Sequence, residues 1–315
     1  MAMYTLAHLS DPHLANWPLP GPGSLLSKRV VGLLSWQFRR RRIHRAAVLD
    51  LLTADLARSG ADHIAVTGDI TNISLPAEFA NAARWLERLG PPERVSVVPG
   101  NHDSYVAVPW SEHMALWASY MAGDAGDNPD AGAARFPYLR RRGPIAIVGV
   151  STAAPMPYNS SGGHLGDAQL ARLEPMLAEL GREGSFRVIL IHHPPQPHAT
   201  QRRKALFDAA AFRHVVVRAG AELILHGHTH RAHLDKISGP AGTVPVLGVP
   251  SASALPHRGK HPAAYHLYRI AANGAGWSIA IETRGLAATC DRIETTGRFR
   301  LEVPRVGVPT VTLMP

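Results

Sequence analysis

The sequence contains the stretch Arg94-Val95-Ser96-Val97-Val98-Pro99-Gly100-Asn101-His102-Asp103. Its apolar, β-branched first part predicts a short buried strand, Arg94–Val98, which the Pro-Gly pair ends. Three polar side chains, Asn101, His102 and Asp103, follow the strand directly. A turn asparagine and a surface histidine would have to coincide at a strand end for this pattern to lack a function, so we interpret it as part of a site.

Four other predicted strands end in motifs of the same kind. These motifs are Asp11-Pro12-His13 after Tyr4–Ser10, Gly68-Asp69 (with Asn72 close behind) after Asp62–Thr67, His192-His193-Pro194 after Phe186–His192, and Gly227-His228-Thr229-His230 after Glu222–His226. Because α/β proteins bind ligands at the carboxyl ends of their strands, we expect the five motifs to meet at one site.

The rest of the chain predicts an α/β fold. Helical spacing is found at Arg42–Arg58, Pro76–Leu89, Trp110–Met121, Asp167–Leu180 and Lys204–Arg218. Further strands are predicted at Ile145–Ser151, Ala232–Ile237, Thr243–Val249, Ala264–Ile270, Trp277–Thr283 and Arg298–Val303. Alternating strands and helices, followed by strands alone, indicate an α/β sandwich. We expect one domain over residues 1–315, with a strand-rich C-terminal part at 231–315 whose last residues, 284–315, complete or cover a sheet edge.

Composition excludes several classes of protein. The 315 residues are 45% hydrophobic and 18% charged, which excludes wholesale disorder. Cys290 is the single cysteine, so a disulfide framework and a cysteine-based zinc or iron–sulfur site are also excluded. The first residues lack a signal-peptide pattern, and no apolar run approaches the length that spans a bilayer. We therefore expect a cytoplasmic protein without a transmembrane segment.

Most of the net charge of +9 comes from one segment. Residues 12–49 contain seven Lys or Arg and no Asp or Glu, whereas the rest of the chain has 26 basic and 24 acidic residues. The middle of this segment mixes apolar and basic residues and precedes Arg39, Arg40, Arg41 and Arg42. We interpret residues 14–45 as a basic amphipathic insertion beside the first motif.

Three interpretations of this insertion stay open. It is a packed helix with a solvated arginine end, or a lid that contacts a membrane surface or a lipid substrate peripherally through residues 24–45. The third interpretation is a contact with nucleic-acid phosphates. Trp36 and Phe38 are too few and too close together for a base-stacking platform, so we do not expect a nucleic-acid partner.

The residue types of the five motifs fit a site for two metal ions. Carboxylate and amide oxygens with imidazole nitrogens suit Mn, Fe and Zn. The one-residue spacer in Asp11-x-His13 and His228-x-His230 keeps two side chains on the same side of an extended segment. Two metals about 3.5–4 Å apart lower the pKa of a bridging water and stabilise both oxygens of a phosphoryl displacement.

Taken together, the five motifs resemble those of the calcineurin-like metallophosphoesterase superfamily, over Asp11–His230. The resemblance implies a four-layer αββα sandwich, in which two mixed β-sheets are flanked by helices. It implies one metal on Asp11, His13, Asp69 and His230, and a second on Asp69, Asn101, His192 and His228. It further implies that a metal-bridging hydroxide attacks phosphorus, that His102 is the general acid or transition-state stabiliser, and that Asp103 orients His102. The cofactors would be two divalent or trivalent ions, namely Mn, Fe or Zn.

A finer resemblance concerns the substrate, which we expect to be a phosphodiester of a small molecule or lipid. The pattern from Gly163-His164-Leu165 to Gln169-Leu170 is similar to the class III cyclic nucleotide phosphodiesterase and glycerophosphodiesterase branch. The alternative interpretation of this pattern is an ordinary helix start at Asp167, without a role in substrate binding. We name the following as candidate substrate-binding residues: Asn72, His164, His193, Arg39, Arg40, Arg41 and Arg42.

Three other functions stay open. UDP-2,3-diacylglucosamine-type pyrophosphatases also carry basic apolar insertions near the site and act on a lipid at the membrane surface. A DNA exonuclease of the same superfamily is another alternative, although the chain lacks the capping domain and coiled coil expected there. A non-catalytic scaffold is disfavoured, because such scaffolds lose metal ligands and every motif position is present here.

Overall fold

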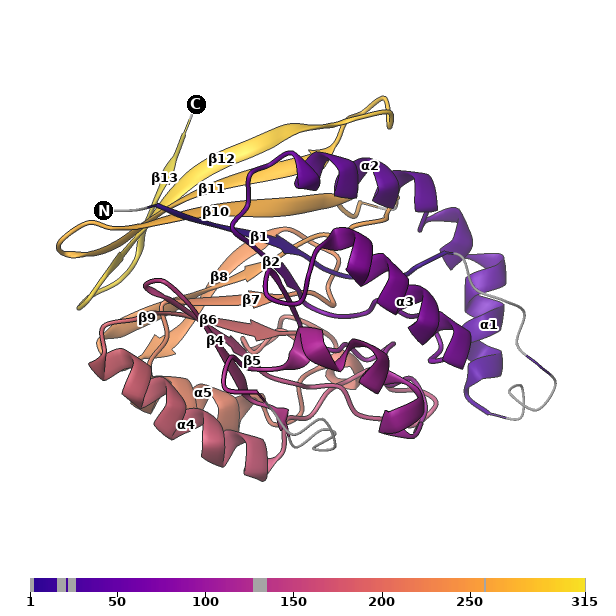
Figure 1. The fold of residues 1–315 in the computed structure, drawn as a ribbon, viewed down its shortest axis with the longest axis horizontal. Coiled ribbons are helices and arrows are strands. Elements are labelled where there is room, and N and C mark those ends of the chain that lie inside the picture. Colours follow the sequence, from indigo (N-terminus) through magenta and orange to yellow (C-terminus); the bar gives the residue numbers. More distant parts are fainter. Residues whose placement is uncertain (1–2, 16–20, 22–26, 127–134, 258, 315) are drawn as a thin grey trace.

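The computed structural model describes residues 3–15, 21, 27–126, 135–257 and 259–314 (Figure 1). Within these residues the strands form two mixed sheets. The seven-stranded sheet has the order β13-β12-β11-β10-β1-β2-β3 and the six-stranded sheet the order β4-β5-β6-β7-β9-β8. The first comprises β1 (Tyr4–Leu9), β2 (His63–Val66), β3 (Val95–Val97), β10 (Ala264–Ala272), β11 (Gly276–Leu286), β12 (Ile293–Pro304) and β13 (Thr310–Leu313). The second comprises β4 (Tyr138–Arg142), β5 (Ile145–Gly149), β6 (Phe186–Ile191), β7 (Leu223–His226), β8 (His233–Gly239) and β9 (Gly242–Gly248).

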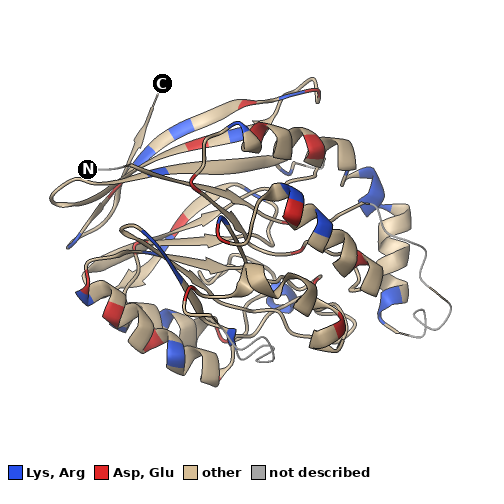
Figure 2. Cartoon of the chain, viewed as in Figure 1, with Lys and Arg blue, Asp and Glu red and all other residues tan. Residues whose placement is uncertain are grey.

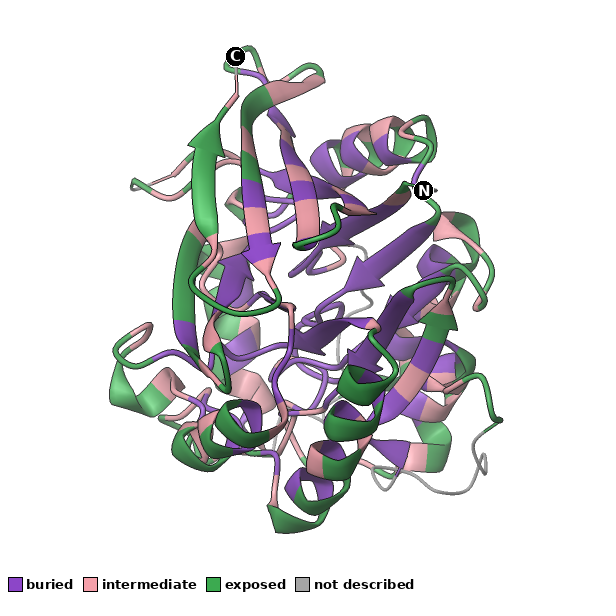
Figure 3. Ribbon diagram, turned by 90° about the vertical axis from the view of Figure 1, so that its left-hand side faces the viewer, coloured by how far each residue is buried: buried purple, intermediate pink, exposed green. Residues whose placement is uncertain are grey.

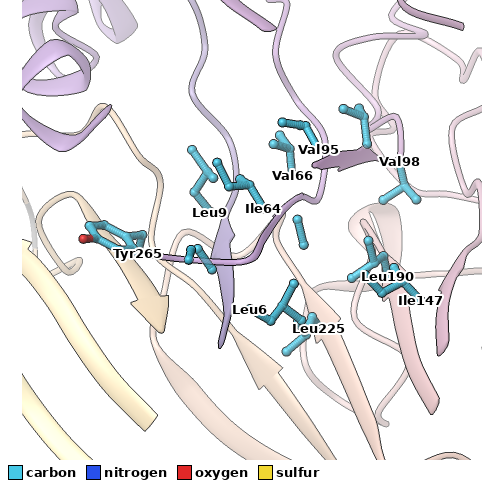
Figure 4. Close-up of a cluster of buried hydrophobic side chains, with 14 of the residues drawn as sticks. Leu6, Leu9, Ile64, Val66, Val95, Val98, Ile147, Leu190, Leu225 and Tyr265 are labelled. Atoms are coloured by element: carbon cyan, nitrogen blue, oxygen red, sulfur yellow. The ribbon is translucent and has the colours of Figure 1, made fainter. Parts of the chain in front are cut away.

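Helices lie outside both sheets (Figure 1). They are α1 (Arg29–Phe38), α2 (Ala46–Ala57), α3 (Pro76–Leu89), α4 (Asp167–Arg182) and α5 (Ala209–Ala219). The apolar side chains of α2 and α3 join those between the sheets in one cluster, and α4 and α5 bury a second cluster against the six-stranded sheet. Figure 4 shows the side chains between the sheets, including Leu6 and Val66 from one and Ile147 and Leu225 from the other. Two mixed sheets flanked by helices confirm the predicted αββα fold class.

The parallel strands set the position of the predicted motifs. In the first sheet β1, β2 and β3 are parallel neighbours, and in the second β5, β6, β7 and β9 are. Such neighbours end at the same edge of a sheet, so motifs that follow them meet although they are far apart in the sequence. The single domain predicted over residues 1–315 stays a prediction.

Three predicted helices differ in the structure. The segment Trp110–Met121 forms two 3₁₀ helices, Trp110–Glu112 and Met114–Met121, because His113 leaves helical geometry (φ −130°) and contacts the Pro109 carbonyl through Nδ1 at 2.9 Å. The helix predicted from Arg42 begins at Ala46, since the extended Arg45 donates its N–H to the Ser253 carbonyl.

The helix predicted from Lys204 begins instead at Ala209. Residues Arg202–Lys204 form a separate 3₁₀ turn, and Leu206 then pairs with Gly163 in an isolated bridge. This pairing holds the chain extended where a helix was predicted.

Strand β4 was missing from the predicted elements, because its three consecutive arginines do not suggest a strand. Arg140 is nevertheless buried, and its guanidinium donates hydrogen bonds to four backbone carbonyls, among them Val95 at 2.7 Å. The predicted strand-rich end is present, with β8 to β13 as the described elements after residue 231. Among the described residues, β12 and β13 complete the edge of the seven-stranded sheet, and β13 is exposed (Figure 3).

Candidate metal centre

Backbone hydrogen bonds hold the motifs together at the carboxyl ends of the strands. The N–H of Asp11 donates to the Gly68 carbonyl at 2.9 Å, and that of His13 donates to the Asp69 carbonyl at 3.1 Å. Asp11 follows β1 and Asp69 follows β2, so these bonds extend the pairing of the two strands past their ends. The second sheet is joined in the same way, since the N–H of Gly227 donates to the His192 carbonyl at 3.2 Å.

Five of the predicted ligands have left-handed backbone conformations. Positive φ values are found at Asp11 (52°), His13 (40°), Asp69 (56°), His228 (65°) and His230 (54°). Residues with a Cβ rarely adopt this conformation, which costs about 1–3 kcal/mol and recurs at functional sites. The concentration of such residues here therefore points to a site whose geometry matters more than local stability.

The first predicted ligand set forms a compact group of facing atoms. Asp11 Oδ1 lies 3.1 Å from His230 Nε2 and 3.9 Å from His13 Nε2. His13 Nε2 lies 3.4 Å from His230 Nε2 and 3.9 Å from Asp69 Oδ2. The structure thus brings the four residues together from the segments that follow β1, β2 and β7.

The second predicted set converges in the same manner and shares Asp69. His192 Nε2 lies 3.4 Å from Asp69 Oδ2 and 3.3 Å from Asn101 Oδ1. His228 Nδ1 lies 2.9 Å from the same Asn101 oxygen. One atom, Asp69 Oδ2, therefore faces both groups of donors.

These donors fit metal ions. Ligand atoms about 2.0–2.2 Å from a common ion lie about 3–3.5 Å from one another, close to the spacings found here. Asp11 Oδ1 is buried and makes no hydrogen bond within the described residues, so it has an unused lone pair in the centre of the first set. Although burial opposes ionisation, His192 and then His102 lower the pKa of Asp69. Burial also disfavours a charged His192, but the Asp69 carboxylate raises the pKa of that ring to about 9.

The described contacts of the Asp103 carboxylate are with backbone groups, and its predicted role in orienting His102 stays a prediction. Its carboxylate accepts hydrogen bonds from the backbone N–H groups of Asp69, Thr71 and Gly100, at 2.8–2.9 Å. The His102 ring contacts the Asn72 carbonyl, 2.5 Å from Nδ1. Asp103 thus fixes the loops that carry the ligands, and a backbone oxygen contacts the His102 ring. Burial, followed by the charge of Arg40, lowers the pKa of His102 to about 4.

Arg40 is the arginine of the insertion that reaches the donors. Its Nη2 lies 2.9 Å from both ring nitrogens of His13, and its Nη1 lies 3.2 Å from both nitrogens of His102. Arg39 also lines the pocket above the donors. Arg41 and Arg42 are exposed and are not among the described lining residues of that pocket, so their role in binding substrate stays a prediction. Residues 16–20 and 22–26 of the predicted insertion lie outside the described residues.

Three other predicted substrate residues do not line this pocket. Asn72 is buried, and its side chain donates to the Leu14 carbonyl at 2.9 Å. His193 is also buried, and its Nδ1 pairs with the Thr152 hydroxyl at 2.7 Å. His164 is half exposed and contacts Asp208 at 3.1 Å. These side chains contact the surrounding loops, and their role in binding substrate stays a prediction.

His44 is a site residue that the motifs did not indicate. Its ring lies 4.6 Å from that of His13 and 5.6 Å from that of His230, and the three residues can offer nitrogens within 4.8 Å of one another. His44 Nδ1 pairs with the Ser253 hydroxyl at 2.9 Å, which leaves Nε2 available. No motif contains His44, and the only signal in the sequence was its place at the end of the insertion.

Four of the predicted ligands, Asp69, Asn101, His228 and His230, line a polar pocket of about 230 Å³. Its described lining residues are Ser35, Arg39, Arg40, Ile43, His44, Asp69, Asn101, His102, Ser161, Lys204, His228, His230, His257 and Lys260. Figure 2 shows Lys and Arg where the chain passes from α1 to α2, the segment that contributes Arg39 and Arg40. The fold and this arrangement define a class, namely an αββα sandwich with a candidate dinuclear metal site at its strand ends.

Comparison with known proteins gives the family. A family model described as calcineurin-like phosphoesterase matches residues 4–232, so the chain belongs to the calcineurin-like phosphoesterases, which are metal-dependent phosphoester hydrolases. No curated protein matches the sequence.

Solved structures resemble the fold at low sequence identity. A dimetal phosphatase from Danio rerio has a TM-score of 0.61 and 14% identity, with 99% of each chain covered. A purple acid phosphatase from yellow lupin (Lupinus luteus) seeds has a TM-score of 0.58 and 12% identity, covering 95% of this chain and 53% of its own. A sulfate thiohydrolase from Thermus thermophilus has a TM-score of 0.51 and 18% identity, covering 93% of this chain and 58% of its own.

Within the described residues, no helix combines the length and apolar character needed to cross a bilayer.

Proposed function

We propose that this chain is a binuclear metal-dependent phosphodiesterase. The observation that carries the proposal is the shared position of Asp69 Oδ2, which faces His13 on one side and His192 on the other. One ion would be held by Asp11, His13, Asp69 and His230, and the second by Asp69, Asn101, His192 and His228. Bound there, two metal ions would activate water and neutralise the oxygens of a phosphoryl group.

The side chains around the donors would orient the substrate. Arg40 presents two Nη groups above His13 and His102, and a guanidinium can bind two phosphoryl oxygens at once. We assign to Arg40 the binding of the reacting phosphoryl group. His102 lies beside Arg40 and is assigned the proton donation to the leaving oxygen. Burial and then the Arg40 charge lower the pKa of His102, so this role requires a substrate anion that raises that pKa.

A phosphodiester as substrate rests on the sequence pattern around α4. In the structure Gln169 of that pattern joins α4 to the end of β5, because its side chain bonds both the N–H and the carbonyl of Ser151 at 2.8 Å. Ser161, in the loop between Ser151 and Gln169, is one of the residues that line the pocket, which supports the proposal. This is the arrangement that a substrate-binding loop would need.

The proposal is tested with bis(p-nitrophenyl) phosphate and p-nitrophenyl phosphate, each with added Mn and with chelator. We expect hydrolysis of the diester to exceed that of the monoester and to stop with chelator. His102→Ala should keep its metal but lose most of kcat for diesters with alkyl leaving groups. Full activity of that variant on an alkyl diester would contradict the role of His102 as general acid. If the protein binds two metals but hydrolyses no phosphoester, the proposed enzyme activity is wrong.

A second candidate places the substrate at an anionic lipid surface, as in the UDP-2,3-diacylglucosamine-type pyrophosphatases. Helix α1 is packed on one side, where Trp36 is buried, and exposes an apolar stripe on the other. The stripe comprises Val31, Leu34 and Phe38, with 49%, 51% and 71% of their surfaces exposed. Exposed arginines follow it directly, and apolar side chains beside cations favour anionic bilayers.

Co-sedimentation with vesicles tests this second candidate. We expect the wild type to bind vesicles of phosphatidylglycerol and phosphatidylcholine and not vesicles of phosphatidylcholine alone. Changing Val31, Leu34 and Phe38 to Ser should abolish binding, whereas Leu313→Ser, at the equally exposed strand β13, should not. If the triple variant binds as the wild type does, or if neither binds, the lipid surface is excluded.

A further inference from the structure

The pocket above the donors has more cations than one phosphoryl group can use. Beyond Arg40, its described lining includes Arg39, Lys204 and Lys260, which come from three separate segments. Asp69 is the one carboxylate among the described lining residues, and it belongs to the candidate metal centre. An anionic ligand is therefore the natural counter-charge for this side of the pocket.

These three cations, which we call the cationic rim, have no acidic partner within 4 Å among the described residues. Lys260 Nζ donates to a backbone oxygen, the Thr229 carbonyl, at 3.3 Å. Lys204 and Lys260 are both half-buried, and after burial the charges of neighbouring cations lower their pKa values. For Lys204 these neighbours are Arg203, Arg39 and Arg40. For Lys260 they are Lys204, Arg231 and Arg39, and the carboxylate of Asp11 in the candidate metal centre opposes them. The three groups thus repel one another across the pocket.

Resting on the proposed function, we infer that the substrate has a second anionic group, a phosphate or a carboxylate, which the cationic rim binds while Arg40 and the metal centre hold the reacting phosphoryl group. Like charges held together without counter-ions destabilise a protein, so such a cluster indicates a ligand that neutralises it. A pocket of about 230 Å³, below the roughly 300–1,000 Å³ of ordinary ligand pockets, suits a compact bis-anionic part of a small molecule.

The inference is tested by calorimetry on the metal-loaded protein with three non-hydrolysable probes. Methylphosphonate carries one anionic group, methylenediphosphonate carries a second phosphonate, and phosphonoacetate carries a carboxylate in its place. We expect the wild type to bind one of the latter two at least ~10-fold more tightly than methylphosphonate. The preferred probe distinguishes a phosphate from a carboxylate as the second group.

Neutralising the two lysines of the cationic rim, with Arg39 kept, should remove most of that preference. In the double variant Lys204→Gln and Lys260→Gln, the ratio of affinities should fall to less than about threefold. Lys236→Gln, an exposed lysine of β8 outside the pocket, should bind as the wild type does. A wild type without preference, or a double variant that keeps it, would overturn the inference. As a second variant, Lys260→Glu should reverse the preference, which a merely structural role of the lysine would not do.

Failure of this inference and failure of the proposed function give different results. Hydrolysis of bis(p-nitrophenyl) phosphate without any preference among the probes refutes the second anionic subsite alone. A preference that depends on Lys204 and Lys260, in a protein that hydrolyses no phosphoester, refutes the phosphodiesterase and supports the subsite.

Discussion

The histidines within the strands and the histidines at the strand ends differ in the partners of their ring nitrogens. In the interior, His8 Nε2 pairs with the Thr67 hydroxyl at 2.9 Å, and His63 Nε2 pairs with the Ser96 hydroxyl at 2.8 Å. At the strand ends, His13 and His230 direct nitrogens at each other and at a carboxylate. A fixed hydroxyl partner marks a structural histidine, whereas facing nitrogens with a shared oxygen mark a candidate ligand.

The largest expected effect breaks the strand-end group at its shared oxygen. Asp69→Asn should remove the charge that both donor sets face, so bound metal should fall below two ions per chain. Diester hydrolysis should fall by more than the roughly 100-fold that loss of an outer partner of a metal ligand costs. Elemental analysis and kinetics measure both. Asp235→Asn, at an exposed position of β8, is the matched control, and two ions bound to the Asp69 variant would contradict the assignment.

The next effect separates substrate binding from metal binding. Arg40→Ala should lower kcat/KM for a diester by about 10–100-fold, because hydrogen bonds to charged groups contribute about 1.5–3 kcal/mol. Metal content should stay at two ions, unlike that of the Asp69 variant. Arg84→Ala, on the exposed face of α3, controls for loss of a positive charge. Equal kinetics for the wild type and the Arg40 variant would remove this assignment.

The interior histidines predict an acid-sensitive fold. Burial, followed by the charges of Arg140 and Arg142, lowers the pKa of His63 to about 3. Below pH 6.5 the unfolded chain binds a proton that folded His63 cannot, so the stability present at pH 7 is lost as pH falls. Between pH 7 and 5 this one group costs about 2 kcal/mol.

Urea unfolding of the metal-free chain at pH 7 and pH 5 measures this loss. His63→Gln can keep a hydrogen bond to Ser96 and should lose about 2 kcal/mol less than the wild type over the same interval. His214→Gln changes an exposed histidine of α5 and should leave the pH dependence as it is. An unchanged pH dependence in the His63 variant would show that folded His63 takes up its proton normally.

The smallest expected effect concerns His44, which the sequence places neither within a strand nor in a strand-end motif. Its Nδ1 has a hydroxyl partner, as in the interior, yet its ring faces His13 and His230, as at the strand ends. His44→Ala should weaken binding of one of the two metals about 10-fold, as loss of an outer partner does. Metal titration measures this affinity, and an unchanged value would place His44 with the structural histidines.

The sequence predicted the strand ends well because their signal is local. Apolar runs that stop at Asp69 or Asn101 mark both the strand and the donor, and parallel pairing then brings the donors together. Features that depend on distant partners could not be predicted. The Asn72 carbonyl that contacts His102 and the carbonyls that satisfy Arg140 are backbone atoms, which no residue type announces. Which of four adjacent arginines faces the donors depended equally on the turn Arg40–Arg42.

The left-handed conformations of the five predicted ligands have a consequence for the evolution of this site. If these residues hold the metals as proposed, the strain there and the charges of Asp11 and Asp69 make the metal-free site a weak point of the fold. Substitutions that abolish the chemistry should therefore leave the metal-free chain as stable as before, or more so. A lineage that no longer needs hydrolysis can lose its catalytic residues while it keeps the sandwich intact.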